Sequence, residues 1–303
     1  MKLNSGSSRR PMIPILSAAL VLVLILALAP SSRQYQGTLQ QAAFPAAGPP
    51  AVQEPSSSKE AEPPPESEPA ESAPSFPYQE LYPDLYCPDF TGESIPAAQK
   101  TVYLTFDDGP SDRTAWILDT LKKNDVKATF FVVGKNAAAR GDLLRRIVEE
   151  GHTLAIHSNT HNYRQIYASV DSFLADFEAV YRLIEQETGV KPSIFRFPGG
   201  SINAYNAGIY PEIIAEMTRR GFRYYDWNVS AQDAAASISV LSVKQGIWRG
   251  GWERPEATVL MHEKWETATA LDEIIYFYRS HDYTFAPLDN KVTPIIFDYK
   301  RCY

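Results

Sequence analysis

The 303-residue sequence predicts an α/β fold built on a parallel sheet, and two observations lead to that prediction. From about residue 98 onward, short runs of apolar, β-branched and aromatic residues alternate with amphipathic stretches of helical length. Repeated strand-then-helix order implies parallel strands joined by right-handed crossovers. About seven such units closing on themselves would form a (β/α) barrel, and an open doubly wound sheet is the alternative.

The elements follow from these runs in chain order. The expected strands are Thr101–Phe106, Ala128–Val133, Thr153–Ile156, Ser193–Phe197, Phe222–Trp227, Thr258–Met261 and Tyr283–Ala286. The expected helices are Ala115–Lys123, Ala138–Glu150, Val170–Glu187, Tyr210–Arg220, Leu241–Trp248 and Thr267–Arg279. They define one folded domain, which we place at residues 85–303.

The first 33 residues predict a membrane anchor. No residue between Arg10 and Arg33 is charged, and residues 12–30 are mostly Leu, Val, Ile and Ala. As a helix this run would extend about 28 Å, close to the thickness of a bilayer core. Basic residues precede the run and no acid occurs in the first fifty residues, so the N-terminus is expected to stay cytoplasmic. A signal peptide cleaved near Ala27–Ala29 is the alternative, and it would make the protein secreted.

Residues 34–84 have the composition of a disordered linker. Ten of the 23 prolines fall between residues 41 and 80, and residues 51–80 carry seven Glu against the single Lys59. Such a segment buries too little apolar surface to offset the entropy of ordering it. We therefore expect an extended spacer that holds an extracytoplasmic domain away from the membrane.

Net charge and cysteine content further limit the class of protein that the sequence can encode. A net charge of −7 disfavours a nucleic-acid-binding protein, which usually needs a basic surface. Cys87 and Cys302 are too few for a disulfide scaffold, and their spacing is not that of a structural zinc site. In an exported protein the two could form one disulfide, and two free thiols are the alternative.

Polar residues gather where the expected strands end. Asp107 and Asp108 close the first strand, and His157 and His161 follow the third. Because the carboxyl ends of parallel strands meet at one mouth, these residues are expected to be neighbours in space. Two His four apart on one helical turn would face the same way and, with one carboxylate, would suit catalytic zinc or non-haem iron. The alternatives are that the two histidines are ordinary surface or core residues, and that Asp-Asp-Gly-Pro forms only a turn.

The two adjacent aspartates are expected to have different roles. On an extended backbone successive side chains point in opposite directions, so one carboxylate could reach a metal while the other faces a substrate. Keeping both ionised requires a nearby cation, and Arg196 at the end of the fourth strand is a candidate beside the metal itself.

Five motifs in order, TFDDGP, HSNTH, RFPGG, WNVSAQD and LMH, resemble the NodB-homology polysaccharide deacetylases of carbohydrate-esterase family four. The resemblance covers roughly residues 98–290, and it implies a distorted (β/α) barrel. Each motif is weak alone, but the ordered set is specific. Ser230, Ala234 and Gly199 depart from the family's usual residues, which leaves the preferred glycan open.

The resemblance also implies roles for individual residues. One divalent metal ion would be bound by Asp108, His157 and His161, with Zn²⁺ expected and Co²⁺, Ni²⁺ or Mn²⁺ as alternatives. The implied catalytic residues are the base Asp107, the general acid His262, Arg196, which would orient Asp107, and Asp233, which would tune the charge network. The implied substrate-binding residues are Leu260, Trp227, Phe197, Pro198 and Gly199.

Together these expectations describe a membrane-tethered, metal-dependent hydrolase that removes N-acetyl groups from a GlcNAc-containing cell-wall glycan, with peptidoglycan expected as the partner. An anchor and spacer would place the site within reach of the wall. An O-acetyl esterase with the same site and a catalytically silent glycan-binding protein are the alternatives.

Overall fold

The computed structural model describes residues 76–298, all of which belong to one compact unit, Pro69–Tyr303. The expected anchor at residues 1–33, the linker up to residue 75 and Cys302 lie outside the described residues, so the anchor and the disulfide stay predictions. No helix between residues 76 and 298 combines the length and hydrophobicity needed to cross a bilayer.

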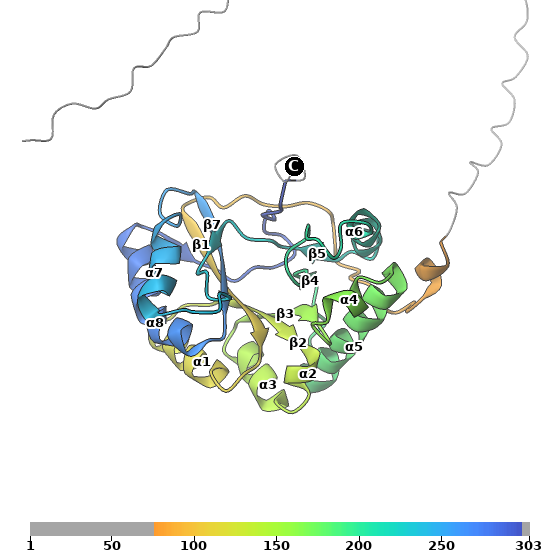
Figure 1. Ribbon diagram of the computed structural model, residues 1–303, viewed down its shortest axis with the longest axis horizontal. Coiled ribbons are helices and arrows are strands. Elements are labelled where there is room, and N and C mark those ends of the chain that lie inside the picture. The colour runs from red at the N-terminus through yellow and green to blue at the C-terminus, as the bar shows by residue number, and fades with distance from the viewer. Residues whose placement is uncertain (1–75, 299–303) are drawn as a thin grey trace, which may run out of the picture. The chain divides into compact units, whose positions relative to one another are not determined.

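Seven parallel strands form a half-barrel, and helices lie along its outer side (Figure 1). The strands are β1 (Thr101–Gly109), β2 (Thr129–Val133), β3 (Thr153–Ser158), β4 (Ile194–Phe195), β5 (Arg223–Tyr224), β6 (Val229–Ser230) and β7 (Glu256–His262). The helices are α1 (Thr114–Lys123), α2 (Gly134–Ala137), α3 (Gly141–Glu149), α4 (Tyr163–Ile166), α5 (Val170–Thr188), α6 (Tyr210–Arg219), α7 (Val240–Trp248) and α8 (Trp265–Ser280), with a short 3₁₀ helix at Pro77–Glu80.

The strand order β5-β4-β3-β2-β1-β7-β6 is the circular order of a barrel that is open at one seam. In residues 76–298 no ladder joins β5 to β6, whereas every other neighbouring pair is connected. A doubly wound sheet would instead reverse its strand order at a switch point, so that alternative is wrong.

Strand β6 was not expected from the sequence, and one expected strand lies outside the main strand order. The two residues of β6 are too few to show a periodicity. The expected strand at residues 283–286 is β8 (Thr284–Phe285), which pairs with the first two residues of β1 and is not in the main strand order.

Alternation along the strands gives the half-barrel an apolar floor and a polar mouth. On β1, Val102, Leu104 and Phe106 pack in the core that includes the helices, while Tyr103 belongs to a second, interior cluster. The buried members of that interior cluster are Tyr103, Phe131, Ala155, Ile194, Tyr225 and Leu288. The inward positions that follow Tyr103 along β1 are polar. The polar side chains of the mouth therefore lie at the carboxyl ends of the strands.

Part of the segment that precedes residue 85 is held against the domain. The side chain of Arg220, fully buried at the end of α6, donates hydrogen bonds to the carbonyls of Tyr78, Leu81 and Tyr82. A buried guanidinium needs such acceptors, and it therefore fixes part of the Pro-rich segment against the domain.

The chain beyond residue 292 covers the free edge of β5. The N–H of Tyr225 donates to β4, and the next N–H, that of Asp226, points the other way and donates to the carbonyl of Ile295 at 2.8 Å. The carboxylate of Asp226 also accepts the N–H of Phe297, whose ring packs edge-on against Trp227 at 4.8 Å. The C-terminal segment 292–298 thus occupies one side of the open seam.

Candidate active site

Asp107 and Asp108 both reach the mouth because the backbone of β1 is irregular there. The register with β2 shifts between Asp107 and Gly109, and Asp108 has a left-handed φ of 69°. Asn136 of α2 holds this conformation by donating to the carbonyl of Asp108 at 2.8 Å. The expected opposite orientation of the two side chains is therefore wrong, because the bulge turns the second carboxylate back toward the first.

His157 and His161 also approach each other by a route that differs from the expected helical turn. His157 is the fifth residue of β3, and His161 follows in an irregular loop with φ 54°. Their rings lie 5.2 Å apart. The carboxylate of Asp176 on α5 fixes the loop by accepting bonds from Ser158 Oγ and from Asn159 and Thr160 backbone N–H groups at 2.7–2.9 Å.

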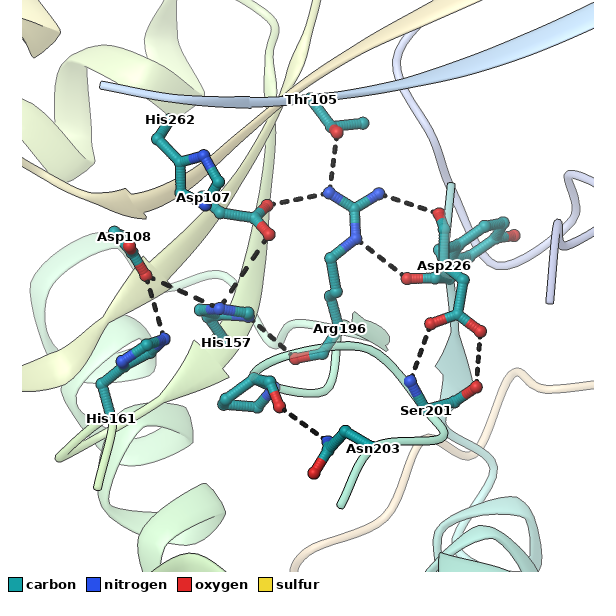
Figure 2. Close-up of polar contacts among 12 residues, drawn as sticks. Thr105, Asp107, Asp108, His157, His161, Arg196, Ser201, Asn203, Asp226 and His262 are labelled. Carbon is teal, nitrogen blue, oxygen red and sulfur yellow. Dashed lines mark hydrogen bonds and ion pairs between the residues drawn. The ribbon is translucent and has the colours of Figure 1, made fainter. Parts of the chain in front are cut away.

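Asp108, His157 and His161 have the donor set and spacing of a divalent-metal site (Figure 2). One potential ligand atom from each lies within 4.8 Å of the others. Asp108 Oδ1 is 3.2 Å from His161 Nε2 and 3.6 Å from His157 Nε2. This oxygen is buried without a hydrogen-bond partner, as expected for an atom that ligates a cation. Two imidazoles and one carboxylate fit zinc and leave positions open for water and substrate.

Protonation in the site also favours metal binding. His157 donates from Nδ1 to the carbonyl of Arg196 at 2.9 Å, which leaves the Nε2 lone pair facing the site. Burial and neighbouring His157 lower the pKa of His161, which favours the neutral form that ligates a metal. Burial alone would raise the pKa of Asp108, but His157 and His161 hold it below its ordinary value.

Arg196 is fully buried and holds Asp107 by a direct ion pair. Its Nη1 donates to Asp107 Oδ1 at 2.8 Å and to Thr105 Oγ1 at 2.7 Å (Figure 2). Its other nitrogens donate to the carbonyls of Tyr225 and Asp226. These contacts satisfy the guanidinium and use one oxygen of Asp107, Oδ1. The other oxygen, Oδ2, lies 3.9 Å from His157 Nε2 and is therefore the one directed at the metal position.

His262, at the end of β7, forms a second pair with the buried Asp233. Asp233 accepts the Nδ1 proton at 2.8 Å, the backbone N–H of His262 at 2.7 Å and the hydroxyl of Thr267 at 2.7 Å. Burial would lower the pKa of His262, but the hydrogen bond to Asp233 and the charge of Asp107 raise it above its ordinary value. Since Nδ1 is engaged, Nε2 is the atom able to exchange a proton in the pocket.

One pocket of about 390 Å³ is lined by Asp107, Asp108, His157, His161 and His262. Its lining includes the expected Leu260, Trp227 and Gly199. Phe197 does not line it: this ring is 1% exposed and packs against Phe173 of α5 at 5.5 Å. Arg196 points into the half-barrel, so the next residue on the extended chain points outward. Pro198 contributes its carbonyl, which accepts the hydroxyl of Tyr167, and it is not part of the pocket lining.

Comparisons with known proteins place the chain in a family. A family model described as polysaccharide deacetylase matches residues 94–212. YheN of Bacillus subtilis, which is named as a member of that class, is 33% identical over 201 residues, covering 65% of this chain and 70% of YheN. The chain belongs to the polysaccharide deacetylase family.

Two further comparisons concern members of this family that act on peptidoglycan. A peptidoglycan-N-acetylglucosamine deacetylase of Bacillus cereus is 32% identical over 170 residues, which span 54% of this chain and 60% of that protein. The solved catalytic domain of a peptidoglycan N-acetylglucosamine deacetylase from Eubacterium rectale is 38% identical, with a TM-score of 0.66 over 68% of this chain and 96% of that domain.

Two acids that support the site of this polysaccharide deacetylase were not predicted from the sequence: the half-buried Asp176 and the buried Glu263. Asp176 fixes the loop that contains His161. It lies three residues after Phe173, on the apolar face of α5, and an acid at such a position is the sequence signal by which it could have been identified. Glu263, next to His262, accepts bonds from Ser111 and Thr114 and so ties β7 to the loop after Asp108. A Cβ at Gly109 would lie 2.0 Å from Glu263 Oε1, which explains the glycine there.

Proposed function

We propose that this chain is a metal-dependent N-deacetylase that hydrolyses the acetamido group of GlcNAc residues in peptidoglycan and releases acetate. The observation that carries the proposal is one pocket lined by the Asp108, His157, His161 donor set together with Asp107 and His262. The buried Arg196 and Asp233 hold Asp107 and His262, respectively, from behind the pocket lining. An amide is a poor electrophile with a poor leaving group, so its hydrolysis needs carbonyl activation, a base for water and an acid for the departing nitrogen.

A divalent cation bound by Asp108, His157 and His161 would polarise the acetyl carbonyl and lower the pKa of water in the site. Asp107 then acts as the base, because Arg196 occupies only one of its oxygens and leaves the other able to accept a proton from that water. The ion pair fixes the direction of the carboxylate inside the half-barrel.

His262 supplies the proton for the leaving nitrogen. Its raised pKa favours the protonated form, and Asp233 orients the ring so that Nε2 faces the pocket. Leu260, two residues earlier on the same face of β7, gives an apolar contact for the acetyl methyl group opposite Trp227. General acid–base assistance of this kind contributes about 10²–10⁴-fold.

The assay is acetate release by the full-length chain, supplied with Zn²⁺, from peptidoglycan and from a GlcNAc oligomer. We expect release from both, and its abolition by a chelator. Asp107→Asn and His262→Ala should lower kcat by about 10²–10⁴-fold, while His157→Ala should remove the metal measured by elemental analysis.

Asp112→Asn is the matched control, because this aspartate is 73% exposed outside the pocket and should leave activity and metal content unchanged. Release from O-acetylated xylan alone would contradict the proposal and favour an O-acetyl esterase. Glycan affinity without acetate release would favour a binding protein.

We further propose that residues 1–33 tether the enzyme to the membrane, with residues 34–84 as its spacer and the catalytic domain outside the cytoplasm. The uncharged run at residues 12–30 supports this proposal. Recovery of the intact chain in the membrane fraction is expected. A mature N-terminus near residue 30 would show cleavage instead.

A further inference from the structure

A second groove adjoins the catalytic pocket on the side of His161. It has a volume of about 530 Å³, within the range of about 300–1,000 Å³ usual for small-molecule sites. We call it the basic groove, and it is lined by Lys135, Thr160, His161, Asn162, Tyr163, Arg164 and Tyr205. His161 and Tyr163 line both cavities, so a chain of sugars could continue from one into the other.

The basic groove carries two cations and no acid among its lining residues. The Nζ of Lys135 donates to the carbonyl of Thr160 at 2.9 Å and forms no ion pair with a residue in the range 76–298. Arg164 is exposed, and it has neither a hydrogen bond nor an ion pair from its side chain to any residue that the structure describes. In a chain of net charge −7, cations without carboxylate partners beside a catalytic pocket indicate an anionic ligand.

Aromatic rings form the wall between the two cavities. Tyr163 packs against His161 at 5.2 Å and against Tyr205 at 5.2 Å. Gly199 makes room for them, since a Cβ there would lie 3.2 Å from the Tyr163 hydroxyl. Amphipathic rings of this kind offer an apolar face to a pyranose and a hydroxyl to its polar edge. Tyr205 is 52% exposed, so its ring is accessible to a ligand.

We propose that the basic groove binds the sugar unit next to the one being deacetylated, and that Arg164 and Lys135 recognise a carboxylate carried by that unit. This inference rests on the proposed function and specifies its substrate class: an anionic glycan is preferred over a neutral one. In peptidoglycan the carboxylate comes from the peptide of the neighbouring sugar, or from its lactyl group where no peptide is attached.

The test compares three substrates of the full-length, Zn²⁺-supplied enzyme: a neutral GlcNAc oligomer, a peptidoglycan strand, and the same strand with its carboxylates methyl-esterified. We expect kcat/KM to be highest for the charged strand and to fall for that strand alone as salt is raised, because ions screen exposed charges. A strand stripped of its peptides carries free lactyl carboxylates in their place, and it shows which carboxylates the groove accepts: retained preference shows that a lactyl carboxylate is accepted, and lost preference shows that only a peptide carboxylate is.

Arg164→Gln should raise KM for the charged strand about three- to tenfold while leaving kcat, and KM for the neutral oligomer, unchanged. Lys135→Gln should act in the same direction, with metal content measured to show that the loop of His161 is intact. Lys291→Gln, an exposed lysine near the opposite ends of the strands, is the control for lost positive charge.

Equal kcat/KM for the charged and esterified strands, or equal losses on all substrates in Arg164→Gln, would overturn the proposed subsite while leaving the deacetylase assignment standing. Absence of acetate from every substrate would instead overturn the proposed function itself. The two failures are therefore distinguishable in one set of assays.

Discussion

Replacing Asp233 by Asn tests whether the pair with His262 sets the protonation of the acid. The substitution keeps the size of a side chain that is 1% exposed. An amide oxygen in the place of Oδ2 would still accept the His262 N–H and the Thr267 hydroxyl, which the carboxylate accepts at 2.7 Å each. The amide NH₂ would then face Nδ1 as a second donor, so the ring must give up its Nδ1 proton and become neutral.

The size of the effect follows from the contact that is lost. A hydrogen bond to a charged group contributes about 1.5–3 kcal/mol, and one pKa unit corresponds to about 1.4 kcal/mol. We therefore expect the pKa of His262 to fall by about 1–2 units from its raised value. Because the general acid must be protonated, the basic limb of the kcat profile should move to lower pH by the same amount.

The assay is kcat for acetate release between about pH 5 and pH 9. Thr267→Val is the control, since it removes one bond to Asp233 and leaves the contact at 2.8 Å between His262 and Asp233 in place. Its basic limb should not move to lower pH. A lower kcat in Asp233→Asn with an unmoved basic limb would show that His262 is not the acid that this limb reports.

Three further predictions concern the supports of the site and the stability of the fold. Asp176→Asn should weaken Zn²⁺ binding by about 10–100-fold in a metal titration, because it loosens the loop that presents His161; unchanged affinity would contradict this role. Gly109→Ala should lower the free energy of unfolding by about 1–3 kcal/mol, as measured by urea denaturation, because the new Cβ meets Glu263 at 2.0 Å; an unaltered unfolding midpoint would refute the contact. Burial lowers the pKa of His152 to about 4 from 6.5, so the unfolded chain takes up a proton first as the pH falls. Stability should therefore be unaffected above about pH 6.5 and decrease by about 3 kcal/mol between there and pH 4, and a His152→Gln variant with the same pH dependence would exclude this cause.

The layout of the fold could be predicted because apolar, β-branched runs of strand length alternate with amphipathic stretches of helical length. Along β1 the inward positions Tyr103, Thr105 and Asp107 pass from floor to mouth, and β7 places His262 opposite Asp107 in register. Strand ends that meet at one mouth were enough to bring the aspartates, histidines and Arg196 together.

Local backbone geometry at the site could not be predicted in this way. Asp108 and His161 both have positive φ, a conformation that bulky residues rarely adopt without support. The supports are long-range: Asn136 holds Asp108, and Asp176 holds the loop of His161. Periodicity contains no information about such contacts, so the expected helical turn and the expected opposed aspartates were wrong although the residues themselves meet.

The C-terminal segment has a practical consequence for anyone who shortens or alters this protein. Ile295 and Phe297 cap an exposed sheet edge and brace the tryptophan wall of the pocket. Trimming the chain before Ile295 would remove the carbonyl that accepts the Asp226 N–H, just after β5, and leave a bare edge able to recruit a strand from another molecule. Changes at Phe297 therefore reach the pocket through Trp227, although Phe297 itself does not line it.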